Sequence, residues 1–284
     1  MSKPDTIETL VLNGALQSDR HRARIGGGQM VAYTSPSPDK DTENEDTVAA
    51  IAYGPQAVVL VVADGAGGLP AGKLASHTAV STLIDRLQSS IAETVLLRTA
   101  ILDGIEAANI AVQDVANGAA TTLTVVTIEG LVARAYQIGD SEAIIVGQRG
   151  LIRLQTPVHS PTGLAVEAGF LDEREALHHA ERHLVSNFLG TSDMRIDVGT
   201  EVWLQPRDTI LVASDGLMDN VHIAEIVLRV RKGPLDKACD AVIGLARRRM
   251  SGIASDQPSK PDDLSLILYR KPYRKAEYGS EKDR

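Results

Sequence analysis

Cysteine is almost absent from this chain of 284 residues, since Cys239 is the only one. A single cysteine excludes an intramolecular disulfide framework and a metal site built from several thiolates. It also does not fit a tyrosine-phosphatase nucleophile, because Leu245 stands six positions on, where that chemistry places an arginine to hold phosphate. We expect Cys239 to be a small buried apolar side chain.

Positive charge and long apolar runs are scarce as well. Lys and Arg number 29 against 37 Asp and Glu, which gives a formal net charge of −8. This balance disfavours a surface for nucleic acid or an anionic membrane, because both require a basic field. No apolar run approaches the ~20 residues of a membrane-spanning helix. The N-terminal residues carry acids where a signal peptide is basic, so we expect a cytoplasmic protein.

Two common phosphate-binding motifs are also missing. The glycine-rich stretch VVADGAGGLP, residues 61–70, breaks the dinucleotide-binding pattern at Pro70. Gly72-Lys73-Leu74 has leucine where a P-loop needs the hydroxyl of serine or threonine. The glycines at 26–28 fit a flexible lead-in to the first strand better than a phosphate cradle.

The hydrophobic pattern indicates strand groups separated by helix pairs. Apolar or alternating runs predict strands at 47–53, 57–63, 122–128, 131–138, 143–148, 209–214 and 264–270. Helical periodicity covers 71–88, 93–116, 224–231 and 235–250. Hairpin-length turns join several strands, which favours antiparallel sheets packed on each other with helices outside. We expect one large domain over 25–272, with flexible ends at 1–24 and 273–284.

Acidic residues stand beside the ends of these predicted strands. Those before a strand are Glu45, Asp46, Asp262 and Asp263, and those after one are Asp64, Asp140 and Asp215. Singly, each fits an ordinary turn residue. In an antiparallel sheet, however, the start of one strand and the end of its neighbour share a rim, so these positions can converge. Crowded carboxylates stay ionised only around a cation, and an all-oxygen donor set favours Mg²⁺ or Mn²⁺ over Zn²⁺.

Glycines stand next to three of these acids, in DGAGG (64–68), GDSE (139–142) and SDGLMDN (214–220). A glycine after Asp64 lets the carbonyl of Gly65 turn toward the same cation that the carboxylate binds, which a Cβ would hinder.

Six segments in this order resemble one family. They are NEDTV, VVADGAGGLPAGKLAS, ATTLTVV, YQIGDSEAIIV, TILVASDGLMDNV and DDLSLIL, between Tyr33 and Arg270. This series resembles the metal-dependent serine/threonine protein phosphatases of type 2C, the PPM family, in their bacterial form. The resemblance implies an α+β fold, a four-layer α-β-β-α sandwich of two antiparallel sheets, with a dinuclear metal centre at one end.

The resemblance also implies roles for single residues. Asp64 would bridge two Mn²⁺ or Mg²⁺ ions, and the carbonyl of Gly65 would bind one of them. Asp215 and Asp262 would hold the first ion and Glu45 the second, while Asp46 orders metal-bound water. Asp140 matches the aspartate that joins Asp215 at a third, looser metal site in bacterial members. Residues 159–190 resemble the flap, which begins at His159 and Ser160 and has His179 in its second half. Surface or supporting roles suit these histidines better than metal ligation.

The implied reaction is direct hydrolysis of phosphoserine or phosphothreonine by a metal-bridging water or hydroxide, with Asp64, Asp215 and Asp46 as its central residues. The expected partners are a phosphoprotein and a Ser/Thr kinase or its targets, and we expect a monomer. No covalent nucleophile is indicated.

The sequence departs from the family pattern at several positions. Asp41 stands where the family has an arginine for the substrate phosphate, so Lys40 beside it is the candidate phosphate ligand. Other departures are Ala120, Glu142 and Asp263. None removes an expected metal ligand. The alternative function is a catalytically weak or inactive pseudophosphatase that binds phosphoproteins.

Overall fold

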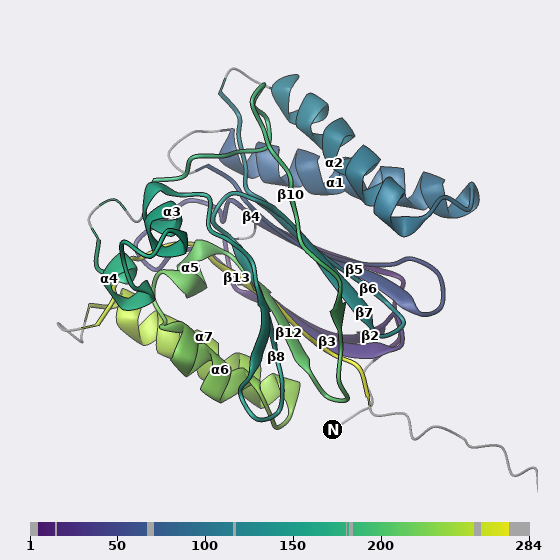
Figure 1. Ribbon diagram of the computed structural model, residues 1–284. Coiled ribbons are helices and arrows are strands. Elements are labelled where there is room, and N and C mark those ends of the chain that lie inside the picture. The colour runs from purple at the N-terminus through teal and green to yellow at the C-terminus, as the bar shows by residue number, and fades with distance from the viewer. Residues whose placement is uncertain are drawn as a thin grey trace, which may run out of the picture.

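Two antiparallel sheets face each other, and helices cover both outer faces (Figure 1). The computed structural model describes residues 5–14, 16–66, 71–115, 118–179, 181, 184–252 and 257–272. The first sheet runs in the order β1 (Thr9–Asn13), β4 (Asp46–Ala52), β5 (Ala57–Asp64), β6 (Leu123–Glu129), β7 (Val132–Ile138) and β10 (Asp197–Val198), and β11 (Val202–Trp203) also pairs with β7.

The second sheet runs in the order β2 (Asp19–Ile25), β3 (Gly28–Ser35), β13 (Leu264–Arg270), β12 (Thr209–Ala213), β8 (Glu142–Val146) and β9 (Ile152–Gln155). Helices α1 (Gly72–Ala92) and α2 (Leu97–Gln113) pack on the first sheet. Helices α5 (Asp215–Met218), α6 (Ile223–Val230) and α7 (Leu235–Met250) pack on the second. Two short helices, α3 (Pro161–Glu167) and α4 (Glu173–Leu177), lie at one end of the sandwich (Figure 1). The predicted four-layer fold is confirmed.

Alternation along the strands builds three apolar layers. In β5, Val59 and Val61 pack under α1 and α2, whereas Leu60 and Val62 pack between the sheets. Successive side chains of a strand point to opposite faces, so one buried strand serves two cores. Cys239 lies in the third layer, where burial raises the pKa of its thiol to about 12. The expectation that Cys239 is a small buried side chain is therefore confirmed.

The expectation that residues 1–24 form a flexible end is wrong for most of the segment. β1 pairs with β4 because Leu10 and Leu12 alternate with exposed residues and are buried between the sheets. β2 is a charged edge strand that pairs with β3. The glycines before β3 form its hairpin turn, with φ of 53° at Gly26 and 77° at Gly27. The expected flexible tail, 273–284, lies outside the described residues.

None of the described helices is long and apolar enough to cross a membrane.

Candidate metal centre

The strand register brings the predicted acids to one end of the sandwich. Asp46, the first residue of β4, pairs directly with Asp64, the last residue of β5. On the facing sheet, Asp215 follows the end of β12, and Asp262 precedes its partner strand β13. Asp140 lies in the connection from β7 to β8. The five aspartates act electrostatically on one another, since the charges of Asp46, Asp215, Asp262 and Asp140 all act on Asp64.

Burial and mutual repulsion together disfavour the ionised form of this cluster. Burial, followed by the charges of neighbouring aspartates, raises the pKa of Asp46, Asp64 and Asp140 well above the ordinary value. The same causes raise the pKa of Asp262 to about 6. Burial also acts upward on the pKa of Asp215, but the Lys260 ammonium group, a hydrogen bond with Asp64 and the charge of Lys40 together lower that pKa. The rim therefore requires positive charge to stay fully ionised.

Two buried oxygen atoms indicate whether a metal ion fits into the acidic centre. Asp46 Oδ1 and Asp215 Oδ1 are buried without a hydrogen-bond partner among the described residues. A buried carboxylate oxygen left unpaired is costly, so both atoms have ligand capacity to spare. The other oxygen of Asp46 accepts a hydrogen bond from Ser214 Oγ at 2.9 Å. The donors present are oxygens, which fits Mn²⁺ or Mg²⁺.

At the same rim, the backbone of Gly65 lies close to the backbone of Gly72 and of Glu45. A Cβ at this position would lie 2.3 Å from the carbonyl oxygen of Gly72 and 2.9 Å from that of Glu45. Only glycine avoids both clashes, so the backbone directly after β5 can lie against Gly72, the first residue of α1. The adjacent glycines of the motif, Gly67 and Gly68, lie outside the described residues.

Two lysines reach into the acidic centre. Lys40 Nζ lies 3.3 Å from Glu45 Oε2, and it also lies 3.8 Å from Asp263 Oδ2. Lys260 Nζ contacts Asp215 and lies 2.9 Å from Asp219 Oδ2. In the described part of the chain, no group of three or more His, Cys, Asp or Glu side chains has the arrangement of a formed metal shell. Here the carboxylates surround ammonium groups instead, so the carboxylates have to turn before they can bind an ion.

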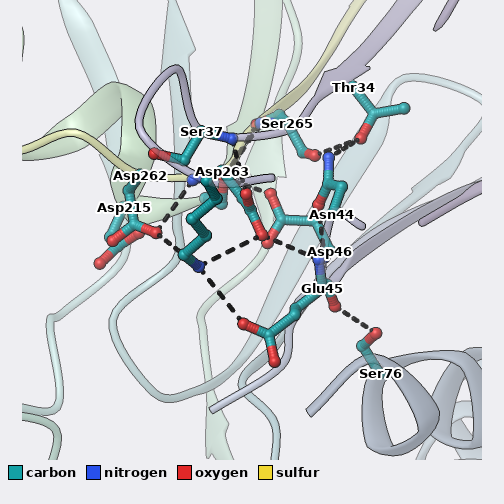
Figure 2. Close-up of polar contacts among 12 residues, drawn as sticks. Thr34, Ser37, Asn44, Glu45, Asp46, Ser76, Asp215, Asp262, Asp263 and Ser265 are labelled. Carbon is teal, nitrogen blue, oxygen red and sulfur yellow. Dashed lines mark hydrogen bonds and ion pairs between the residues drawn. The ribbon is translucent and has the colours of Figure 1, made fainter. Parts of the chain in front are cut away.

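Asp263 holds the loop that carries Lys40 and Glu45. Figure 2 shows its carboxylate accepting hydrogen bonds from the backbone N–H groups of Ser37, at 2.7 Å, and Glu45, at 2.8 Å. An asparagine has one acceptor oxygen and could satisfy only one of the two. The sequence shows that Asp263 departs from the family pattern. Its role as a clamp, which ties Ser37 and Glu45 together, can be seen only in the folded chain. Asp41 is exposed, whereas its neighbour Lys40 reaches the acidic centre.

The flap histidine His159 supports the loop before Asp140. Its Nδ1 accepts a hydrogen bond from the N–H of Gly139 at 3.1 Å, and its Nε2 lies 2.9 Å from Asp197 Oδ2. The expected supporting role of His159 agrees with these contacts. Ser160 caps α3, because its Oγ accepts a hydrogen bond from the N–H of Gly163 at 2.9 Å. His179 accepts a hydrogen bond from the N–H of Glu181 within the flap.

A cavity of about 900 Å³ opens between the flap and the start of α6. Val166 and Leu177 line it from the flap, and His222 and Ile223 from the side of α6, while Asp140 connects it with the acidic centre. The sequence indicated the flap through its family resemblance but predicted no cavity. It missed the α6 side, because the pattern of α6 is that of an ordinary amphipathic helix.

A model of the protein phosphatase 2C family matches residues 38–239, which is more than half of the chain. The chain therefore belongs to the protein phosphatase 2C family.

Named relatives agree with this membership. Protein phosphatase PhpP of Streptococcus pneumoniae is 30% identical over 194 residues, which cover 66% of this chain and 78% of PhpP. A serine/threonine phosphatase from S. agalactiae superposes with a TM-score of 0.71 at 27% identity, covering 86% of this chain and 99% of its own. The catalytic domain of the phosphatase PstP, solved in complex with two manganese ions, has the same fold, with a TM-score of 0.69 at 22% identity and coverage of 87% and 99%.

Proposed function

We propose that this metal-dependent protein serine/threonine phosphatase hydrolyses phosphoserine and phosphothreonine at the acidic rim, around two Mn²⁺ or Mg²⁺ ions. The observation that carries the proposal is the pairing of Asp46 with Asp64, opposite Asp215, where one buried oxygen each of Asp46 and Asp215 has no hydrogen-bond partner among the described residues. When bound, the two ions supply an activated water and neutralise the charge of the phosphate. The pseudophosphatase alternative is not favoured, because every expected acid is present at the rim.

Each ligand has a place in the proposed shell. Asp64 would contact both ions, Asp215 and Asp262 would hold the first and Glu45 the second, and the carbonyl of Gly65 would bind one of them. Asp46 orders a water molecule through Oδ1, because Ser214 already occupies its Oδ2. Ser214 thereby fixes the orientation of the Asp46 carboxylate. The proposal also includes a third cation beside Asp140 and Asp215. This cation need not be a metal ion, because the ammonium group of Lys260 already contacts Asp215.

Lys40 is the proposed ligand of the substrate phosphate. Its ammonium group lies within 4 Å of Glu45, Asp262 and Asp263, at the mouth of the proposed shell. If Glu45 and Asp262 held the ions, this ammonium group would lose two of its partners and could donate a hydrogen bond to a phosphate oxygen. A lysine binds phosphate as a point charge and lacks the paired hydrogen bonds of an arginine.

The cavity beside the flap is the proposed contact for the phosphoprotein. It opens next to Asp140, so a bound chain can place its phosphorylated side chain at the rim and a neighbouring residue in the cavity. The walls carry apolar groups such as Val166 together with Arg174 and Glu225, which suits a protein segment of mixed character. The Ser/Thr kinase partner, the monomeric state and the cytoplasmic location expected from the sequence stay predictions.

Hydrolysis of p-nitrophenyl phosphate with Mn²⁺, with Mg²⁺ and with a chelator tests the proposed function. We expect turnover with either ion and its loss in chelator, restored by adding metal back. A protein that binds a phosphoserine peptide and hydrolyses neither it nor p-nitrophenyl phosphate at saturating Mn²⁺ would instead be a pseudophosphatase.

A further inference from the structure

Lys260 lies among three carboxylates of the acidic rim. Its Nζ contacts Asp215, lies 2.9 Å from Asp219 Oδ2 and lies 3.4 Å from Asp262 Oδ2. Only 22% of its side chain is exposed. Charges so close together in a poorly hydrated place interact more strongly than a surface ion pair does. This lysine is therefore part of the charge balance of the centre.

Hydrogen bonds fix the backbone position of Lys260. Asn220, which is fully buried, donates from Nδ2 to the carbonyl of Lys260 at 2.8 Å and accepts the N–H of Lys260 at Oδ1, also at 2.8 Å. The carbonyl of Asn220 in turn accepts a hydrogen bond from Arg249 at 2.7 Å, and Ser259 donates to the carbonyl of Arg249 at 2.7 Å. A long surface lysine usually samples many rotamers, but both backbone groups of this one are tied to the core.

The two carboxylate oxygens of Asp215 have different surroundings. Oδ2 contacts Lys260, while Oδ1 is buried and has no hydrogen-bond partner among the described residues. Asp215 can therefore bind an ion through Oδ1 and keep its contact with the lysine. The charges that act most strongly on Asp140 are those of Asp215, Asp219 and Lys260. The ammonium group thus contacts Asp215 and Asp219 directly, and its charge also acts on Asp140.

We propose that the Lys260 ammonium group takes the place of a third metal ion beside Asp140, Asp215 and Asp219. The centre then holds two exchangeable ions and one tethered cation. A tethered ammonium group stays in place when the metal concentration falls, whereas a loosely held ion dissociates. It carries one positive charge and occupies the space that a hydrated divalent ion needs. This inference rests on the two-ion centre of the proposed function.

Counting the manganese ions bound per chain tests the inference directly. Isothermal titration calorimetry, with the free Mn²⁺ followed by electron paramagnetic resonance, gives the number for the wild type, Lys260→Ala, Lys260→Arg and the control Lys237→Ala. We expect two ions in the wild type and three in Lys260→Ala, with the added ion bound more weakly than the first two. Lys260→Arg keeps the positive charge and should bind two. Lys237 is an exposed lysine of α7, so its variant changes the net charge equally and should also bind two.

Thermal melting in chelator provides a second measurement. Lys260→Ala should melt lower than the wild type, because three carboxylates lose their cation. Mn²⁺ should raise the melting temperature of Lys260→Ala by more than it raises that of the wild type. Three ions in the wild type, or the same number in the wild type and Lys260→Ala, would overturn the inference whatever the melting temperatures. A wild type that binds two ions while Lys260→Ala also binds two leaves the proposed function standing. A wild type that binds none contradicts both.

Discussion

At the scale of single residues, the acidic centre combines side chains whose individual environments are unfavourable. Asp46, Asp64 and Asp140 are held together although burial and repulsion raise the pKa of each. A folded protein tolerates such a cluster at a functional site, where a bound cation offsets the repulsion. The residue-level predictions concern what happens when one member loses its charge.

Replacing Asp64 or Asp215 with asparagine should slow turnover strongly while the fold survives. Each change removes a negative charge from the proposed two-ion shell, and a loss of ~3–5 kcal/mol of transition-state stabilisation corresponds to ~10²-fold or more in rate. The measurement is kcat with p-nitrophenyl phosphate at saturating Mn²⁺, with circular dichroism as the folding control. Wild-type turnover in either variant would show that the metal assignment is wrong.

Replacing Lys40 with alanine should raise KM for a small aryl phosphate and change kcat little. A charge-assisted hydrogen bond contributes ~1.5–3 kcal/mol, so KM should rise by ~10-fold or more. The effect falls on KM because this contact holds the ground state and the transition state alike. The matched control is Asp41→Ala, which alters the exposed neighbour on the same loop and should leave KM within about twofold. Similar KM values for Lys40→Ala and the wild type would remove Lys40 from the phosphate site.

At the scale of elements, the flap and α6 are two walls of one cavity built from distant parts of the chain. Ser160 and the capping box of Asp172 with Glu175 shape the two short flap helices. His159 ties the start of the flap to the N–H of Gly139, next to Asp140. The flap is thus anchored to the metal centre at one end, while its helices lie over the cavity.

A change in the flap wall of the cavity should affect proteins more than small substrates. Leu177→Asp places a charge in the apolar wall, so kcat/KM for a phosphoprotein should fall by ~10-fold or more, whereas p-nitrophenyl phosphate should be cleaved within about twofold of the wild-type rate. The control is Leu164→Asp, at an exposed flap position outside the cavity lining. Equal losses on both substrates would instead make the flap part of the catalytic scaffold.

At the scale of the whole molecule, the rim couples stability to pH and to metal. The five carboxyl groups with raised pKa values bind protons in the folded state that the unfolded chain has already released; they are those of Glu45, Asp46, Asp64, Asp140 and Asp262. The pKa of Asp262, for example, moves from an ordinary 3.8 to about 6 on folding. By linkage, the stability contributed by such a group is present at low pH and is lost as the pH rises through this window.

The metal-free protein should therefore melt higher at pH 5.5 than at pH 7.5. Asp262 alone contributes about 1 kcal/mol to this difference, or a few degrees in melting temperature, because its full ~3 kcal/mol is present only below its ordinary pKa. Asp215 acts oppositely, but only below its ordinary pKa, because Lys260 lowers that pKa. Burial lowers the pKa of His222, and its protonation reduces the gain on acidification. Calorimetry in chelator makes the measurement.

Saturating Mn²⁺ should reverse this order, because metal binding requires deprotonated carboxylates and weakens in acid. Asp262→Ala is the matched variant and should reduce the difference between the two pH values in chelator. A metal-free wild type that melts lower at pH 5.5 would show that the rim carboxylates are not destabilised by burial and by one another.

The sequence by itself determined the strand ends at which Glu45, Asp46, Asp64, Asp140, Asp215 and Asp262 stand, because alternation and turn residues are local signals. It also determined that antiparallel neighbours would bring these acids to one rim. It did not reveal β2, whose charged residues suit an exposed edge strand and give no apolar pattern.

Only the tertiary structure decided which cations meet these acids. Lys260 and Asp215 are 45 positions apart, and their contact depends on Asn220 placing one loop against another. The clamp of Asp263 on Glu45 spans 218 positions, and the α6 wall of the cavity meets the flap only in the folded chain. Local periodicity carries no information on such separations, because they depend on how the two sheets and their helices pack.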